Sequence, residues 1–250
     1  MARMEFLSEN LFNTTTQAKV DSNTTTVEYL FDRSTSLGYS SDGYNSTTAT
    51  MISVEFSAPQ VISHILMQNH NLRDFRLFYD SATANSLLVD ATNSNTSTYL
   101  AFSSVTVSSV QLQMNNTIEG SVEKEIRELF IGERHVQFER NPTVKKWKPM
   151  IFRKQIEHEM PDGGTVLFNI KDKYRASLAW EYITDDFRDD LYTVHRSALP
   201  LYFVPFPTAT AWLGEAYETV WTGGFDFKHA TNDKDQGWSG SINLKETPGR

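Results

Sequence analysis

The stretch MISVEFSAPQVISHILMQNHNLRDFRLFYDS, residues 51–81, decides how the first part of this chain folds. Apolar and polar residues alternate in three runs, at Ile52–Phe56, Ile62–Met67 and Phe75–Tyr79. Turn residues separate the runs, at Ser57-Ala58-Pro59 and Asn69-His70-Asn71. Such runs are typical of antiparallel strands with one buried face. We therefore expect a β-sandwich whose loops, rather than a catalytic cluster, form the functional surface.

Composition narrows the class of protein. The chain has 250 residues, 12% of them aromatic, which is enough for one large core or two small ones. It has no cysteine, which excludes a disulfide framework and thiolate metal sites. No apolar run reaches the roughly 18 residues of a membrane span, so we expect no membrane insertion. The first residues lack the apolar segment of a secretory signal, and we expect none.

Charge is distributed unevenly along the chain. The net charge is −8; residues 1–140 carry 9 basic and 16 acidic side chains, whereas residues 141–250 carry 14 and 15. An acidic chain without a basic stripe is a poor partner for a phosphate backbone. We therefore expect no nucleic-acid binding.

The pattern predicts a mainly β protein with two domains. Composition changes at Asn141-Pro142, and the segment 141–149 contains two prolines and a basic cluster, as linkers do. The prediction is a β-sandwich over 1–140, a linker over 141–149, and an α+β domain over 150–250. The strands expected in the first domain are Thr50–Phe56, Ile62–Gln68, Phe75–Asp80, Ser86–Asp90, Thr98–Phe102 and Val105–Met114. Glu123–Gly132 suits a helix or a strand, and we favour a strand.

The second domain is predicted to be a β-sandwich with a first hairpin, one helix and a long C-terminal hairpin formed by its last two strands. Pro161-Asp162-Gly163-Gly164 is a turn motif between two strands. Thr184 can cap a helix with Asp185 and Asp186 in its first turn, where acids are favoured, and Pro200 ends it. The expected strands are Phe152–Met160, Thr165–Ile170, Tyr174–Tyr182, Leu201–Phe206, Tyr217–Lys228 and Trp238–Leu244.

The first domain resembles the discoidin, or coagulation factor 5/8 C-type, family of galactose-binding-like jelly rolls. The resemblance covers residues 5 to about 140. The residues that carry it are Leu30-Phe31-Asp32, Ile52–Phe56, Pro59, Ile62–Leu66, Phe75–Tyr79 and Ile126–Phe130. It implies a jelly roll that binds glycans, lipids or proteins through loops at one end, or that serves as a structural appendage.

Two further segments resemble tail proteins of bacterial viruses. Asn69–Phe75 is similar to discoidin-like modules of such proteins, which are fused to a second β-rich domain. The closing pattern from Trp221–Phe225 through Gly237–Gly240 to Glu246–Pro248 is similar to a tail-tube or distal-tail β-sandwich. The resemblance implies a structural protein of a virion tail or baseplate.

The Gly- and Ser-rich segment 38–45 holds the candidate ligand-binding residues. Tyr39 and Tyr44 could stack on a sugar ring, with Asp42 and Asn45 supplying hydrogen bonds. The alternative, that these tyrosines fold back onto the sandwich, is equally open. His70, in the turn after the second run, is the fifth candidate.

The residues themselves predict no metal site. His64 lies in a strand and His70 in a turn, whereas the ligands of a metal must converge from adjacent elements. The discoidin resemblance implies that a Ca²⁺ ion could be held by carbonyl oxygens with Asp32 or Asp42. The alternative is that Asp32 caps a turn. No other cofactor is expected.

Enzymatic activity is not expected. The sequence lacks the nucleophile-elbow, Walker, HExxH and GxGxxG motifs. Glu157 and Glu159 share a strand face, and a glycosidase that uses one of them is the weakest hypothesis, since nothing places an acid and a base across a bond.

The sequence thus predicts a non-enzymatic virion protein, assembled in the cytoplasm of a bacterial host. Its second domain would form a homo-oligomeric ring with other tail proteins as neighbours, and its jelly roll could bind host-surface glycan. Large aromatics are enriched at interface cores, so the candidate interface residues are Trp147, Trp212, Trp221 and Trp238. The alternative is a stand-alone carbohydrate-binding protein.

Overall fold

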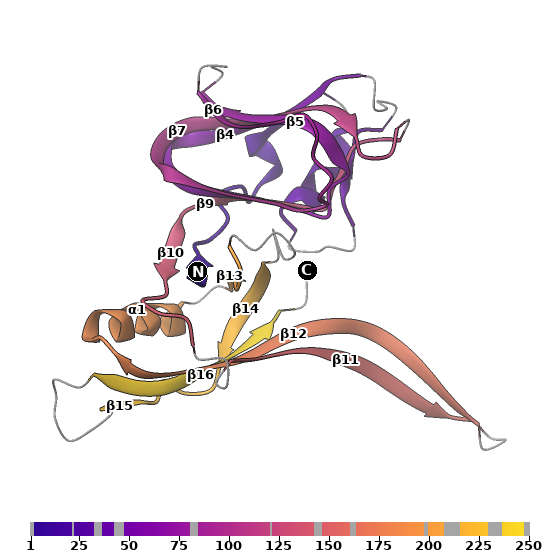
Figure 1. The fold of residues 1–250 in the computed structure, drawn as a ribbon. Coiled ribbons are helices and arrows are strands. Elements are labelled where there is room, and N and C mark those ends of the chain that lie inside the picture. Colours follow the sequence, from indigo (N-terminus) through magenta and orange to yellow (C-terminus); the bar gives the residue numbers. More distant parts are fainter. Residues whose placement is uncertain are drawn as a thin grey trace.

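The protein is mainly β, as predicted. A computed structural model describes residues 3–21, 23–32, 37–42, 48–80, 85–120, 122–142, 147–160, 164–197, 200–207, 216–229 and 237–247. Its described strands form sheets of eight, six and two strands with antiparallel pairing. The six- and two-stranded sheets make up the jelly roll, and the eight-stranded sheet forms a second layer beside it (Figure 1).

The jelly roll contains the first half of the chain except for its two ends. The strand order of the larger sheet is β2-β4-β7-β5-β6, with β9 also on β4, and β3 pairs with β8. Two 3-10 helices, η1 (Thr15–Gln17) and η2 (Thr24–Leu30), precede these strands. The strands are β2 (Ala18–Val20), β3 (Tyr39–Ser40), β4 (Thr50–Gln68), β5 (Leu72–Tyr79), β6 (Ser86–Asp90), β7 (Thr98–Thr117), β8 (Glu125–Ile126) and β9 (Glu128–Gly132).

The predicted turn at Ser57-Ala58-Pro59 is wrong, because β4 passes through it as one strand. Proline cannot donate to a ladder, and the pairing of β4 with β7 shifts register between Glu55 and Gln60. Likewise β7 runs through the gap predicted after Phe102. Figure 1 shows β4 and β7 curving together around the interior of the jelly roll. The strand favoured for the ambiguous segment 123–132 is confirmed as β8 and β9.

Alternating residues of these strands fill the jelly-roll core. Successive side chains of a strand point to opposite faces of the sheet, so every second residue, usually an apolar one, points into the core. Fully buried examples are Ile52, Ile62, Phe75, Leu77, Leu112 and Met114.

The second sheet takes strands from both ends of the chain. Its order is β10-β1-β13-β14-β16-β12-β11, with β15 on β16. Strands β1 and β10 come from residues 5–7 and 134–137, within the range predicted for the first domain, so the jelly roll lies in sequence between two neighbouring strands of this sheet. The strands are β1 (Glu5–Leu7), β10 (Arg134–Gln137), β11 (Trp147–Glu159), β12 (Thr165–Ile183), β13 (Leu201–Val204), β14 (Tyr217–Thr222), β15 (Phe227–His229) and β16 (Trp238–Glu246).

The predicted helix and the first predicted hairpin are both present. The strand predicted over Tyr217–Lys228, part of the long C-terminal hairpin, is divided into β14 and β15, and both pair with β16. Helix α1 (Asp185–Arg196) begins where the Thr184 hydroxyl accepts a hydrogen bond from the Phe187 amide at 3.2 Å, and it buries Phe187, Leu191 and Val194. Strands β11 and β12 run on past the rest of the sheet as a two-stranded projection, hereafter the arm (residues 150–173; Figure 1). Among the described residues, no helix has the length and apolar character needed to cross a membrane.

Candidate functional site

The loops that adjoin Asp42 form a hydrogen-bonded network on the jelly roll. The Ser41 amide donates to the Lys124 carbonyl at 3.0 Å, and the Ser40 hydroxyl donates to Glu123 Oε2 at 2.7 Å. The Asn71 side chain donates to the Glu123 carbonyl at 2.7 Å. Asp42 itself is exposed. This network holds three loops together beside the one candidate carboxylate that faces solvent.

The other candidate residues of this region differ in their surroundings. Tyr39 is 0% exposed and packs in the jelly-roll core. Of the two alternatives, the one in which its ring folds back onto the sandwich is therefore correct, and the ring is not accessible to a sugar. Tyr44 and Asn45 lie outside the described residues, and their role stays a prediction.

His70 pins the turn between β4 and β5. It is 2% exposed, its Nε2 lies 2.9 Å from Thr98 Oγ1, and its Nδ1 accepts from the Leu72 amide at 3.2 Å. Burial lowers the pKa of His70 to about 4, so the ring is neutral at pH 7. Both ring nitrogens contact other groups of the protein, so His70 stabilises the turn and does not form part of an exposed binding surface.

The Ca²⁺ ion that the discoidin resemblance implies, held by carbonyl oxygens and one Asp, stays a prediction, because residues 43–47 beside Asp42 lie outside the described ones. Within the described residues, no three His, Cys, Asp or Glu side chains are grouped as metal ligands. Beside Asp42, the side chain of Lys124 is buried, and its ammonium donates to the Thr48 carbonyl at 2.5 Å. A positive charge at this carbonyl disfavours a divalent cation on the same oxygen.

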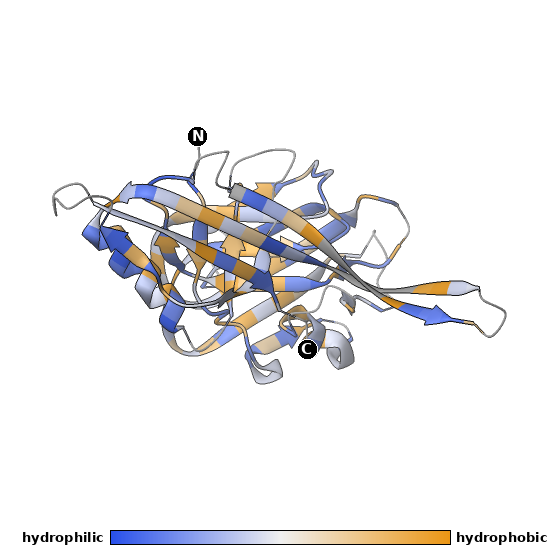
Figure 2. Ribbon diagram, turned by 90° about the horizontal axis from the view of Figure 1, so that it is seen from below, coloured by the Kyte–Doolittle hydropathy of each residue, from blue (hydrophilic) through white to orange (hydrophobic). Residues whose placement is uncertain are grey.

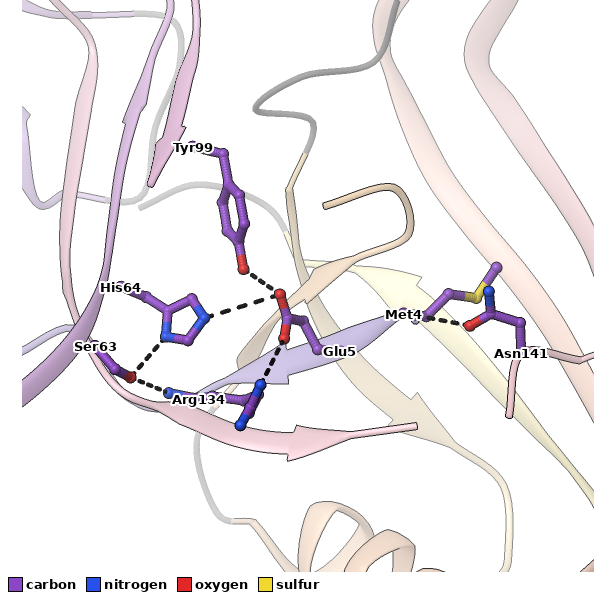
Figure 3. Close-up of polar contacts among 7 residues, drawn as sticks. All are labelled: Met4, Glu5, Ser63, His64, Tyr99, Arg134 and Asn141. Carbon is purple, nitrogen blue, oxygen red and sulfur yellow. Dashed lines mark hydrogen bonds and ion pairs between the residues drawn. The ribbon is translucent and has the colours of Figure 1, made fainter. Parts of the chain in front are cut away.

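A buried polar cluster joins the jelly roll to the second sheet (Figure 3). Glu5 of β1 accepts a hydrogen bond from the Tyr99 hydroxyl of β7. Its carboxylate also lies 3.9 Å from His64 Nε2 of β4 and 3.9 Å from Arg134 Nη1 of β10. The Ser63 hydroxyl lies 2.7 Å from His64 Nδ1. Four strands from both layers therefore meet at one carboxylate.

Burial sets the protonation of this cluster. Burial raises the pKa of Glu5 and lowers that of His64 to about 4, with the Arg134 charge adding to the second effect. Burial also raises the pKa of Tyr99. Serine, histidine and glutamate in a row resemble a hydrolytic relay. Ser63, His64 and Glu5 are only 6%, 3% and 2% exposed, however, so no substrate reaches them and the cluster acts as a tie between layers.

Sequence reasoning missed Glu5. Its one signal was an acid flanked by apolar residues in Met4-Glu5-Phe6-Leu7. A second tie lies nearby, where Tyr202 of β13 donates to Glu128 of β9 at 2.7 Å. Around these polar contacts an apolar cluster fills the junction, formed by Leu7, Leu66, Tyr99, Phe130, Tyr202, Val204 and Ala216.

Two of the four candidate interface tryptophans pack within the second layer. Trp238 donates to Asp185 and stacks on His229, with ring centroids 3.9 Å apart. Trp221 is half-buried against the core of this layer. Trp147 lies in β11, but its side chain is outside the described residues, as is the whole of Trp212.

The arm exposes most of its apolar side chains. Twelve large apolar side chains of the described residues are exposed, and six of them lie on the arm: Met150, Ile151, Ile156, Met160, Val166 and Leu167. Figure 2 shows hydrophobic segments continuing onto the arm beyond the body. Glu157 and Glu159 stand exposed on the same arm, opposite Leu167 and Thr165.

Comparison with known proteins finds structural similarity to about half of this chain. No family model and no curated protein matches it. A mutant of chitosan-binding module 1 from a chitosanase/glucanase of Paenibacillus sp. IK-5 is 14% identical, with a TM-score of 0.42 over 51% of this chain and 98% of the module.

Two further structures are similar to the same extent. The module CpGH89CBM32-6 of Clostridium perfringens is 17% identical, with a TM-score of 0.39 over 49% of this chain and 98% of its own. The family 32 carbohydrate-binding module of Streptococcus pneumoniae EndoD is 15% identical, with a TM-score of 0.38 over 46% and 95%. These similarities are too weak to assign a ligand to this chain.

Proposed function

We propose that this protein is a non-enzymatic assembly subunit whose arm joins it to neighbouring subunits. The proposal takes this assembly to be the tail or baseplate ring of a virion, formed in the cytoplasm of a bacterial host, and the sequence resemblance described above supports it. In this proposal the jelly roll is a peripheral module on the ring. The observation that carries the proposal is the exposed apolar surface of the arm.

The arm is a lone hairpin. Two strands without a covered face are marginally stable in water, and this arm has apolar side chains on both of its faces, such as Ile156 on one and Leu167 on the other. Contiguous exposed apolar surface marks an interaction site in a soluble protein. Among the described strands, β11 is also the outer one of its sheet, so one of its sides faces no other described strand. A neighbouring subunit would cover both features.

The test is the native mass by light scattering, together with negative-stain imaging. The wild type is expected to form multimers, and the triple variant Ile156→Thr, Val166→Thr, Leu167→Thr is expected to be monomeric. A matched control changes three exposed valines on the jelly roll: Val61→Thr, Val89→Thr, Val122→Thr. This control should assemble like the wild type. A wild type that stays monomeric at all concentrations would overturn the proposal.

Glycan binding by the jelly roll is the second candidate function. The observation that favours it is the hydrogen-bonded loop network beside exposed Asp42, because preformed loops with a few polar groups suit small ligands. The stand-alone version predicts a monomer with measurable glycan affinity. Titration calorimetry with chitosan and galactose oligosaccharides tests it, and Asp42→Ala and Tyr44→Ala should each weaken binding. Equal affinity in both variants and the wild type would contradict this site.

A further inference from the structure

The arm changes sign of charge along its length. Residues 147–154, at the base, include Lys148, Arg153 and Lys154 and no acid. Residues 155–170, which contain the far end, include Glu157, Glu159 and Asp162 and no lysine or arginine. The far end, residues 156–159 and 165–167, is hereafter the tip. It combines the exposed acids Glu157 and Glu159 with exposed apolar side chains.

A hollow of complementary character lies at the base of the arm. It has a volume of about 700 Å³ and spans strands β11, β12, β14 and β16. Its cationic lining residues are Lys148, Arg175 and Lys245, and its apolar ones include Pro149, Met150 and Leu244. Lys148 and Lys245 are exposed. An acidic and apolar segment is therefore the occupant that this surface suits.

The tip cannot fill the hollow of its own chain. From Met150, on the rim of the hollow, to Glu159 at the tip, β11 rises by nine residues, or about 30 Å at the usual rise of a strand. Both strands of the arm are paired from base to tip, so the arm extends away from its base instead of folding back (Figure 1). The occupant must come from another molecule.

We infer that the tip of one copy docks in the hollow of the next, with Glu157 and Glu159 facing Lys148 and Lys245. This inference rests on the proposed assembly function and names its contact. Because tip and hollow are different surfaces of one chain, the contact is heterologous and repeats from copy to copy. Such contacts close into a ring when the rotation permits, and otherwise extend as a filament. Opposite charges fix the register, and the apolar side chains supply buried area.

Charge reversal of each surface tests the contact in the full-length protein. The tip variant carries Glu157→Lys and Glu159→Lys, and the hollow variant carries Lys148→Glu and Lys245→Glu. Each variant alone places like charges on both surfaces, so self-association should weaken about tenfold or more. An equimolar mixture of the two restores opposite charges at every contact and should assemble. Sedimentation velocity measures all three samples against the wild type.

A control of matched charge separates this contact from net-charge effects. Glu28→Lys with Glu119→Lys changes two exposed acids of the jelly roll and should leave assembly unchanged. If the wild type assembles but the tip and hollow variants do so equally well, the tip contact is overturned and the assembly function stands. If the variants fail to associate and their mixture fails as well, the pairing of tip with hollow is overturned. A wild type that never assembles overturns the assembly function itself.

Discussion

The jelly roll and the arm are built from similar strands in opposite surroundings. In the jelly roll, side chains such as Phe75 and Leu112 are 0% and 1% exposed. On the arm, Ile156 and Leu167 are 53% and 57% exposed, although the strands that carry them pair just as regularly. Strand formation therefore does not depend on burial of every apolar side chain within this chain. The jelly roll therefore contributes the stability of a packed core, whereas the arm carries exposed apolar surface.

The largest effect is expected at the junction that connects the two layers. Phe130 is 0% exposed and lies against the ring of Tyr202, with centroids 4.9 Å apart. Phe130→Ala should lower the free energy of unfolding by about 3–5 kcal/mol, because it leaves a cavity in a closed cluster. Urea denaturation measures this, with Phe130→Leu as a milder control. A loss below about 1 kcal/mol would show that the junction is not well packed.

Acid should destabilise the jelly roll through its buried histidines. Burial lowers the pKa of His70 to about 4 in the folded protein, from the 6.5 of an exposed imidazole. The neutral ring therefore contributes stability above pH 6.5, and this is lost as the pH falls toward 4, by about 3 kcal/mol. The pKa of His64 is also lowered by burial, so its contribution to stability is likewise lost as the pH falls. The pKa of Glu5 is raised, so its contribution to stability is instead lost as the pH rises through the pKa of the folded state.

The measurement is the free energy of unfolding at several pH values between 7 and 4 for the wild type and for His70→Gln. The variant should show a shallower dependence on pH in that window. Identical slopes for the two proteins would mean that His70 is protonated in the folded state and that the turn is open to water.

A smaller effect is expected where helix α1 begins. The Thr184 hydroxyl caps the helix and also donates to Glu139 Oε2 at 2.7 Å. Thr184→Ala should cost about 1–2 kcal/mol, whereas Thr184→Ser keeps the hydroxyl and should cost much less. Thermal unfolding followed by circular dichroism compares the two. Equal losses would point to the lost methyl group instead of the cap.

The smallest effect on folding should come from the arm itself. Ile156→Ala removes an exposed side chain, so the free energy of unfolding of the monomer should change by less than about 0.5 kcal/mol. The same substitution should weaken self-association in light scattering. A large loss of monomer stability would break the comparison, because it would show that the arm packs against its own body.

Local chemistry was enough to predict the elements with strong patterns. The helix from 185 to 196 followed from Thr184, the two acids after it and the spacing of Phe187, Leu191 and Val194. The hairpin followed from the turn motif of residues 161–164. In contrast, the three residues of β1 are too few to show a period, and their partner β13 lies almost 200 positions away in sequence. The strand break expected at Pro59 is absent, because β7 pairs with β4 on both sides of the register shift between Glu55 and Gln60.

The sequence likewise predicted some features of the candidate site but not others. Sequence pattern placed Tyr39 and Asp42 in one loop segment, but only the packed structure separates a buried ring from an exposed carboxylate three residues away. Glu5 carried almost no sequence signal, since its burial depends on Tyr99 and Arg134, which reach it from elsewhere in the chain. Whether a polar group is buried and paired depends on residues that are distant from it in sequence.

The sequence alone predicts a mainly β chain with a β-sandwich, one capped helix and the hairpin of β11 and β12, because alternation, turn residues and caps act between residues close in sequence. Contacts in the folded protein determine that the ends of the first half join the second sheet, that Tyr39 and His70 are enclosed, and that Lys148, Arg175 and Lys245 line one hollow at the base of the arm. Those outcomes depend on contacts between residues far apart in sequence, and no local pattern encodes them.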